Sequence, residues 1–215
     1  LLERSVTMTK ASTFFTPEER ERIAAAVREA ETRTSGEIVP MVVDQSYDYP
    51  RAGMVGAFFF SLATSLLICW WLAISSLWVF LPIFLVGYLV FHLLIRWLPG
   101  LRRALLPADE VTAEVEEMAK IAFLDQGLHR TRDETGILIL VSLLEHRVQV
   151  LADRGINNRV PPDTWDEIVA LVTAGIRQRK TCDALCQAVR RCGDLLQEHF
   201  PPRKDDRNEL SNLIT

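Results

Sequence analysis

The stretch that decides the fold runs from Ala52 to Ile95 and reads AGMVGAFFFSLATSLLICWWLAISSLWVFLPIFLVGYLVFHLLI. It contains no Lys, Arg, Asp or Glu, although the chain on either side is rich in charge. A bilayer core needs about 20 apolar residues for one helical crossing, so this stretch is long enough for two crossings and a tight turn. It predicts a transmembrane helical hairpin over residues 52–98, with the remainder of the chain on one side of a membrane.

Aromatic residues mark the ends of the two predicted helices. Trp70 follows Tyr49, and Trp97 follows Trp78, at a spacing of about 20 residues, which is about 30 Å of helix. Tryptophan prefers the headgroup level of a bilayer, and this places the turn near residues 74–77. The alternative, a buried helical hairpin of a soluble protein, would need protein to cover all of these lipid-compatible side chains.

The flanking cations predict the orientation. All of them lie at the open end of the hairpin, and the predicted turn carries no charge: Arg51, Arg96, Arg102 and Arg103. Cytoplasmic flanks of membrane helices are enriched in Lys and Arg. We therefore expect a two-span protein of the inner (cytoplasmic) membrane, with the soluble domain and both termini in the cytoplasm.

Composition limits what the rest of the chain can be. About 170 residues lie outside the apolar stretch, which is enough for one domain with a real core and hardly enough for two. The net charge of -4 gives no nucleic-acid footprint, so we expect no nucleic-acid partner. The four cysteines, with Cys69 inside the apolar stretch, form no secreted disulfide framework.

The soluble segments alternate between helix and strand signals. Thr16 before Pro17 is typical of a helix N-cap, and Pro40 inside the first strand suggests an edge position. The expected strands are Glu37–Asp44, Ile137–Leu143 and Val148–Ala152, and the later helices are Ala108–Leu124, Asp163–Arg179 and Cys182–Phe200. The expected organisation is one discontinuous domain, residues 11–50 and 102–200, the hairpin, and a flexible tail at 201–215.

Four short segments resemble the TPM domain family. They are Phe14–Glu19 (FFTPEE), Thr34–Val39 (TSGEIV), Thr135–Ser142 (TGILILVS) and Arg147–Ile156 (RVQVLADRGI). The resemblance implies an α/β fold, a mixed-sheet sandwich with helices on both faces, here interrupted by the two-helix transmembrane hairpin. This agrees with the element order that the residues predict.

The resemblance also implies a range of functions. The family is named for a thylakoid lumen protein, a photosystem II repair protein and a nematode acetylcholine-receptor modulator, which suggests an accessory role toward membrane proteins. Bacterial relatives often occur beside LemA-like membrane proteins, and some plant members are described as acid phosphatases. Many family members place the domain outside the cytoplasm with a helix after it, whereas here a hairpin follows the first strand.

Carboxylates at strand and helix ends are the candidate catalytic residues. Asp44 follows the first strand, Asp125 precedes the second and Asp153 follows the third. Ligands gather at the carboxyl ends of strands in α/β sheets, so Asp44 and Asp153 could converge and hold Ca²⁺ or Mg²⁺ for a phosphatase. The alternative is that these are solvated carboxylates that cap turns.

Two further clusters carry competing interpretations. The loop residues Arg154, Asn157 and Asn158 could bind a ligand, or they could form a turn in which Gly155 and an Asn adopt positive φ. His129–Arg132 could meet phosphate or lipid headgroups, or could be a solvated basic loop. Three cysteines lie near one another in the last predicted helix, where we expect partly buried thiols in preference to a zinc site: Cys182, Cys186 and Cys192.

Two hypotheses of different class follow. In the first, a membrane-anchored, non-catalytic interaction domain assists the assembly, maintenance or regulation of membrane proteins. In the second, the chain is a metal-assisted phosphatase acting near the membrane surface. Small residues of the first span favour close helix packing with another chain, as a homo-oligomer or a complex with another membrane protein: Gly53, Gly56, Ala57, Ser61, Ala63 and Ser65.

Overall fold

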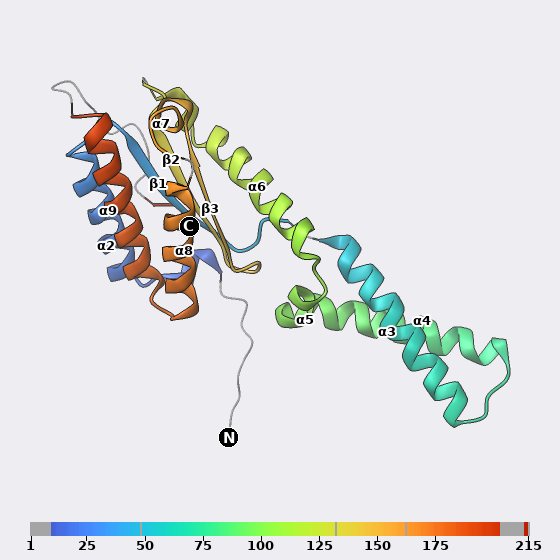
Figure 1. Cartoon of the computed structure of the whole chain (residues 1–215). Coiled ribbons are helices and arrows are strands. Elements are labelled where there is room, and N and C mark those ends of the chain that lie inside the picture. The colour runs from blue at the N-terminus through green and yellow to red at the C-terminus, as the bar shows by residue number, and fades with distance from the viewer. Residues whose placement is uncertain (1–9, 48, 132, 162, 203–212, 215) are drawn as a thin grey trace. The chain divides into compact units, whose positions relative to one another are not determined.

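The computed structural model describes residues 10–47, 49–131, 133–161, 163–202 and 213–214 (Figure 1). These residues divide into two compact units, each described by itself below. Residues 49–111 form the hairpin unit, and the other described residues form the α/β unit.

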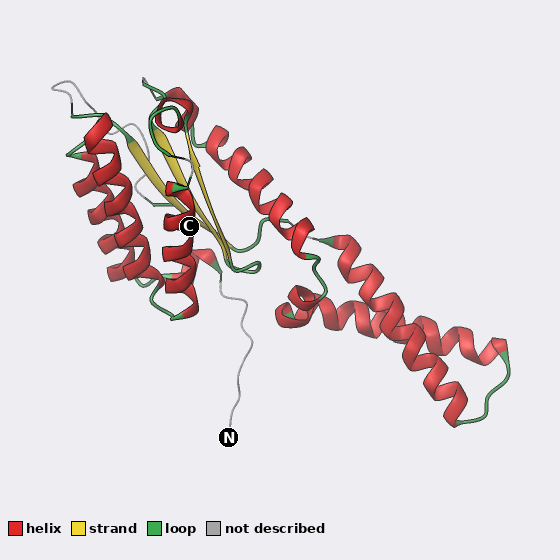
Figure 2. Cartoon of the chain, viewed as in Figure 1, coloured by secondary structure: helices red, strands yellow, loops and turns green. Residues whose placement is uncertain are grey.

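Helices and one three-stranded sheet make up the two units (Figures 1 and 2). In the hairpin unit the elements are α3 (Pro50–Trp71), α4 (Leu77–Trp97) and α5 (Pro99–Ala104), followed by the start of α6 (Ala108–Asp125). In the α/β unit they are α1 (Ala11–Phe14), α2 (Pro17–Glu31), β1 (Glu37–Val43), the rest of α6, η1 (Leu128–Arg130), β2 (Gly136–Ser142), β3 (Arg147–Ala152), α7 (Arg154–Asn157), α8 (Thr164–Arg177) and α9 (Thr181–His199). The predicted mixed α/β class with two long apolar helices is confirmed.

The sheet is mixed and has the order β1-β2-β3. β1 pairs with β2 in parallel, with Glu37 opposite Gly136, and β2 pairs with β3 antiparallel, with Ile137 opposite Ala152. All seven residues of β2 are buried, which agrees with its continuous apolar sequence. The central strand is therefore covered on both faces, as the sequence predicts.

Alternate residues of β2 serve the two faces. Ile137 and Ile139 join the core that the sheet shares with α2, α8 and α9, while Leu138 and Leu140 point to the other face, since side chains alternate along a strand. On that second face α6 runs alongside the sheet (Figure 2). The buried positions of α6 recur at helical spacing: Val115, Ala119 and Ala122.

The predicted N-cap of α2 is a complete capping box. The backbone N–H of Glu19 donates to Thr16 Oγ1 at 3.2 Å, and the backbone N–H of Thr16 donates back to Glu19 Oε2 at 3.0 Å. Pro17 occupies the first helical position, where its missing N–H has no cost. The start of this helix therefore depends on interactions that are local in sequence.

Pro40 is tolerated because β1 is an edge strand of the three-stranded sheet. The outward backbone N–H of Ile38 donates to Glu31 Oε1 at 3.2 Å, and that of Val42 donates to the Ile214 carbonyl at 2.9 Å. Pro40, between them, has no N–H to satisfy, and its carbonyl accepts from the Ile214 N–H at 3.1 Å. The predicted edge position is thus correct.

The C-terminal segment differs from its prediction at one place. Ile214 forms a parallel bridge with Met41, and Leu213 packs against the core. The prediction of a flexible tail is therefore wrong for these two residues, because the edge of β1 offers them backbone partners. Residues 203–212 and 215 lie outside the described residues.

In the hairpin unit, the small residues of α3 face inward. Ala57, Ser61 and Ser65 are buried, and Ser61 Oγ donates to the Phe84 carbonyl of α4 at 2.6 Å. A Cβ on Gly87 of α4 would lie 2.8 Å from Ser61 Oγ, so the absence of a side chain there permits the close approach. These positions are used within the chain, and of the small residues predicted to meet another chain only Ala63 is exposed.

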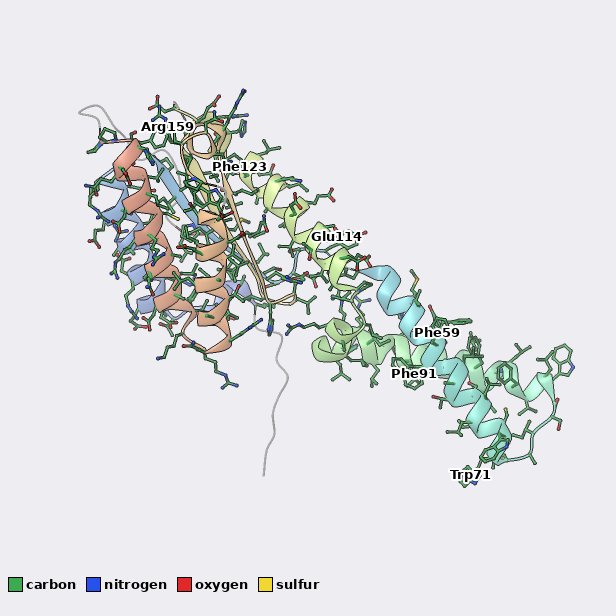
Figure 3. All side chains as sticks on the ribbon, in the orientation of Figure 1. Phe59, Trp71, Phe91, Glu114, Phe123 and Arg159 are labelled. Carbon is green, nitrogen blue, oxygen red and sulfur yellow. The ribbon has the colours of Figure 1, made fainter. Side chains whose placement is uncertain are left out.

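Large apolar side chains cover the outside of the hairpin. Trp70 and Trp78 are 79% and 84% exposed, and Phe59 and Trp71 project from α3 into its surroundings (Figure 3). Residues 53–71 and 77–97 are long and apolar enough to cross a membrane, with 28% and 6% of their most apolar windows buried. Most of each window is thus exposed within this chain, which fits a membrane protein.

Candidate functional site

Three of the family-like segments meet at one end of the sheet. β1 and β2 begin at this end and β3 finishes there, because β3 is antiparallel to its neighbour. We call this the motif end and define it by Thr34–Glu37, Thr135–Ile137 and Ala152–Ile156. The opposite end, where β1 and β2 finish, is called the Asp44 end and is defined by Asp44, Ser142 and Glu145.

At the motif end, the first segment holds the last turn of α9. Thr34 Oγ1 donates to the Phe200 carbonyl at 2.7 Å, and the backbone N–H of Ser35 donates to the same oxygen at 3.1 Å. A Cβ on Gly36 would lie 2.8 Å from Leu196 Cδ1. The Thr-Ser-Gly sequence is therefore explained by helix docking, with glycine needed for close packing.

The second and third segments also have structural explanations. The backbone N–H of Thr135 donates to Thr131 Oγ1 at 3.0 Å, which orders the entry to β2. A Cβ on Gly155 would lie 2.5 Å from the Asp133 carbonyl and 2.6 Å from the Glu134 carbonyl. Among the described glycines only Gly127 has positive φ, so the predicted positive φ at Gly155 is wrong, and close backbone approach is the reason for glycine there.

In the predicted binding loop, Asp153 and Asn157 hydrogen-bond to neighbouring residues, whereas Arg154 and Asn158 point to the surface. Asp153 Oδ1 accepts from the backbone N–H of Arg154 at 2.7 Å and caps α7. Asn157 Nδ2 donates to the Ala152 carbonyl at 2.6 Å, and Asn157 Oδ1 accepts from Trp165 Nε1 at 3.0 Å. The side chains of Arg154 and Asn158 are exposed at the surface of the motif end.

At the other end of the sheet, Asp44 and Glu145 accept hydrogen bonds from backbone and hydroxyl groups. Asp44 Oδ1 accepts from the backbone N–H of Ala11, and Glu145 Oε1 accepts from the backbone N–H of Ser46 at 3.0 Å. The other carboxylate oxygen of Glu145 accepts from Ser142 Oγ. Glu145 is a buried polar residue, and its contact with Ser46 could not be expected from the sequence because the two residues are 99 positions apart.

The expected convergence of Asp44 and Asp153 is wrong. Asp44 follows the end of β1 beside Ser142, whereas the backbone N–H of Asp153 donates to the Gly136 carbonyl at the start of β2. The seven residues of β2 separate these two places by roughly 20 Å. The rule that ligands gather at carboxyl ends applies to parallel strands, and β3 is antiparallel.

Asp125 does not complete a metal site with the other two carboxylates. It is the exposed last residue of α6, shortly before Leu128, whose carbonyl lies beneath Gly136 at the motif end. Over the described ranges, no group of three or more His, Cys, Asp or Glu side chains is placed to hold a metal ion. The proposed set of Asp44, Asp125 and Asp153 is therefore not brought together by this fold.

The cysteines of α9 belong to the core. Cys182, Cys186 and Cys192 are free thiols that are buried among the residues of the sheet, α2 and α8. Burial raises the pKa of Cys192 to about 12, and burial with the neighbouring Cys186 raises the pKa of Cys182 to about 12. A raised pKa keeps the thiols of Cys182 and Cys192 neutral, and neutral thiols are poor nucleophiles and poor metal ligands. All three cysteines pack in the core.

An open groove of about 560 Å³ lies between α2 and α9. Arg22 Nη2 donates to Asp183 Oδ1 across it at 2.5 Å, and this hydrogen bond raises the pKa of Arg22. Neither the predicted catalytic aspartates nor the predicted binding residues line this groove. It is a feature of the helical layer that the sequence analysis did not anticipate.

Fold and motifs together define a mixed α/β protein that carries an apolar helical hairpin between β1 and β2. Residues 105–195 match the TPM domain family. The resemblance to this family that is seen in the sequence is therefore confirmed over residues 105–195. The matched region includes two of the four family-like segments, and the pairing of β1 with β2 brings the Thr34–Val39 segment into the same sheet.

One solved structure shows the same fold. The NMR structure of the BA42 protein from the psychrophilic bacterium Bizionia argentinensis is similar to this chain with a TM-score of 0.59 and 22% sequence identity. The similarity covers 96% of this chain and 98% of the BA42 chain. No curated protein matches the sequence. At this identity the likeness to BA42 concerns the fold alone.

Proposed function

We propose that this chain is a membrane-anchored TPM-domain interaction module. The hairpin crosses the inner membrane and the α/β unit faces the cytoplasm, where it assists the assembly, maintenance or regulation of a membrane protein. The partner is a second copy of this chain or another membrane protein, for which a LemA-like protein is the candidate that the family resemblance suggests.

The outward face of the hairpin supports this proposal most directly. Its exposed side chains include Trp70, Trp71, Trp78, Phe59 and Leu85, and residues 52–95 contain no Lys, Arg, Asp or Glu. Exposure of this much apolar surface to water is strongly unfavourable, whereas a bilayer accepts it. Hydrogen bonding within α3 and α4 also satisfies their backbone groups, as a membrane requires.

The place of the hairpin in the chain supports a role at the membrane surface. The sheet is built from strands on both sides of the insertion, since β1 precedes α3 and β2 follows α6. The α/β unit is therefore joined to the hairpin by two chain connections. A domain held in this way can act on a target at or inside the membrane, but not at a distance.

Membrane insertion and orientation are tested together. Single cysteines are placed at Ser75, in the turn of the hairpin, and at the exposed Arg147, in a variant whose four native cysteines are replaced by alanine. In intact bacterial cells, an impermeant maleimide should label the S75C variant and should label the R147C variant only after the inner membrane is opened. Release of the protein by alkaline carbonate would contradict insertion, and the reverse labelling pattern would contradict the orientation.

The partner is tested with a photo-crosslinking amino acid on α3. Phe59 is 62% exposed, whereas Ser61, two positions later, is fully buried against α4 and serves as the matched control. Illumination of native membranes should give a protein adduct from position 59 and none from position 61. If position 59 gives only lipid adducts, the hairpin does not contact a partner protein.

The absence of catalysis is tested with a generic phosphomonoester. Because Asp44 and Asp153 lie at opposite ends of the sheet, the purified full chain should not hydrolyse it, with or without added Mg²⁺ or Ca²⁺. Hydrolysis that is lost in the D44N, D125N and D153N variants and on chelation would replace the interaction module by the metal-assisted phosphatase.

A further inference from the structure

The two edges of the sheet differ in how their outer backbone groups are protected. The outer side of β1 is covered by Glu31 and Ile214 and is interrupted by Pro40. β3 forms the opposite edge (Figure 1), contains no proline or lysine, and carries a single charged residue, Arg147, at its start. An edge strand without such protection is a template for the pairing of a further strand.

The pairing with β2 determines which backbone groups of β3 point outward. The N–H of Asp153 donates to the Gly136 carbonyl at 2.9 Å, and these two residues continue the register of the strands, so they form a hydrogen-bonded pair. Hydrogen-bonded and non-hydrogen-bonded pairs alternate along an antiparallel ladder. Val148, Val150 and Ala152 therefore direct their N–H and C=O groups away from β2.

Most of these outward groups are free to bind another strand. Asn157 Nδ2 donates to the Ala152 carbonyl at 2.6 Å, which agrees with the outward direction and leaves that oxygen a second lone pair. Among the described residues, none hydrogen-bonds to the outward backbone groups of Val148 or Val150. Both valines are 5% exposed, and their side chains lie in the core that the sheet shares with α8. A neighbouring strand would therefore meet backbone groups at this edge.

We propose that the edge of β3 pairs antiparallel with β3 of a second copy of this chain, which joins the two sheets into one. Hydrogen bonds can form only where outward-directed residues face each other. A two-fold axis at Val150 meets this condition, because it places Val150 opposite its equivalent and Val148 opposite Ala152 of the partner subunit. Opposite residues point to the same face, so the core faces of both copies lie on one side of the joined sheet.

The side chains of this register are complementary, which favours a second copy as the occupant. The exposed Arg147 faces Asp153 of the partner subunit, and the half-buried Leu151 is covered by Gln149 of the partner subunit. Symmetry makes each contact occur twice. An axis at Gln149 would instead place Asp153 opposite Glu145 of the partner subunit, and an axis at Leu151 would place Arg147 opposite a glycine. Charge therefore selects the axis at Val150.

This inference rests on the proposed function, because it names a second copy of the chain as the partner of the interaction module. The contact lies on the α/β unit, whereas insertion into a membrane concerns the hairpin unit. The two proposals can therefore fail separately.

The register is tested by disulfide formation between full-length chains in native membranes. Two variants whose native cysteines are replaced by alanine, one with Q149C and one with L151C, are co-expressed with different tags and oxidised. Opposite residues of a pair that is not hydrogen-bonded have Cα atoms about 4.5 Å apart, within reach of a disulfide, so the two variants should become linked. The matched control combines R147C with L151C, which are opposite only with the axis at Gln149, and should give about tenfold less product.

The strength of the pairing is tested by a change of charge. R147E would place two carboxylates opposite each other twice in each dimer, and it should raise the Kd of the dimer in mild detergent about tenfold. R190E, at an exposed arginine of α9, is the control and should leave the Kd unchanged. Near-ultraviolet circular dichroism checks that each variant is folded.

Three results would overturn the proposal: a monomeric wild type, a product from the control cysteine pair equal to that from positions 149 and 151, or a dimer of equal strength in the wild type and R147E. Carbonate extraction of the same membranes separates these results from the proposed function. A chain that resists extraction but gives no disulfide between positions 149 and 151 is an anchored module without this edge contact.

Discussion

The two units differ in the exposure of their apolar side chains. Leu89 of α4 is 60% exposed, whereas Leu140 of β2 has no exposed surface. Both belong to uncharged apolar runs, but the run of β2 is the length of one strand and that of α4 is the length of a bilayer crossing. The length of an uncharged apolar run therefore tells more than its hydrophobicity. A run of strand length is buried inside the protein, whereas a run long enough to cross a bilayer can be covered by lipid.

The largest expected effect concerns the packed unit. A G155V substitution should destabilise the α/β unit by about 3 kcal/mol or more, because the new Cβ would meet two backbone carbonyls that cannot move aside. Chemical denaturation in mild detergent, followed by near-ultraviolet circular dichroism, measures the change. G100A is the control, since a Cβ there meets no atom within 4 Å and alanine favours the helix. A G155V protein as stable as the wild type would contradict the packing at the motif end.

A charge on an exposed leucine should distinguish the two units directly. Leu89 and Leu124 have similar exposure, 60% and 56%. L89R should cost about 3 kcal/mol of membrane insertion, whereas L124R on α6 should change stability by less than about 0.5 kcal/mol. The fraction of protein that resists carbonate extraction measures the first effect, and thermal unfolding measures the second. Equal tolerance of both substitutions would show that the hairpin is not in lipid.

Loss of the α2 capping box should have a smaller effect. T16A removes the hydroxyl that accepts from the Glu19 N–H, and the expected cost is about 1 kcal/mol of unfolding free energy. T32A, at the other end of the same helix, removes a hydroxyl that only donates to the Glu29 carbonyl, so we expect a change within about 0.5 kcal/mol. Urea titration of both variants measures the difference, and a larger loss in T32A would contradict the capping assignment.

Ionisation of the Cys192 thiol should leave the unfolding free energy unchanged at neutral pH and should lower it measurably in alkali. The folded pKa of Cys192 is about 12, above its ordinary value of 9.0, so its contribution to stability is fully present below pH 9.0 and is lost as the pH rises toward 12. The slope of unfolding free energy against pH in this window should become shallower in C192A than in the wild type. C69A, in the hairpin, is the control variant for this slope measurement. An unchanged slope in C192A would show that its thiol ionises as easily in the folded state as in the unfolded state.

Local signals in the sequence predicted much of the fold. Thr16 and Pro17 predicted the start of α2, the uncharged run predicted α3 and α4, and the continuous apolar residues from Ile137 predicted the central strand. Each prediction depends on neighbours within a few residues, where capping, helix length and side-chain periodicity act. The family resemblance added the expectation of a mixed sheet with helices on both faces.

The candidate site was less predictable because it depends on strand direction. Asp153 was expected near Asp44, but the antiparallel pairing of β2 with β3 places it at the other end of the sheet. Among the small residues of α3, Ser61 contacts α4 of the same chain through its hydroxyl, a contact that the sequence pattern did not specify. Glycine 155 was expected for its φ and is needed for its missing Cβ.

By itself, then, the sequence determined the kinds of elements, their order and the apolar hairpin, because these follow from local propensity and from the length of uncharged runs. The tertiary structure alone decided which ends of the strands meet, which face of α3 is covered, and that Ile214 pairs with the edge of β1. These features join residues that are far apart in the chain. Their free energy comes from packing and hydrogen bonds that exist only after the strands have paired.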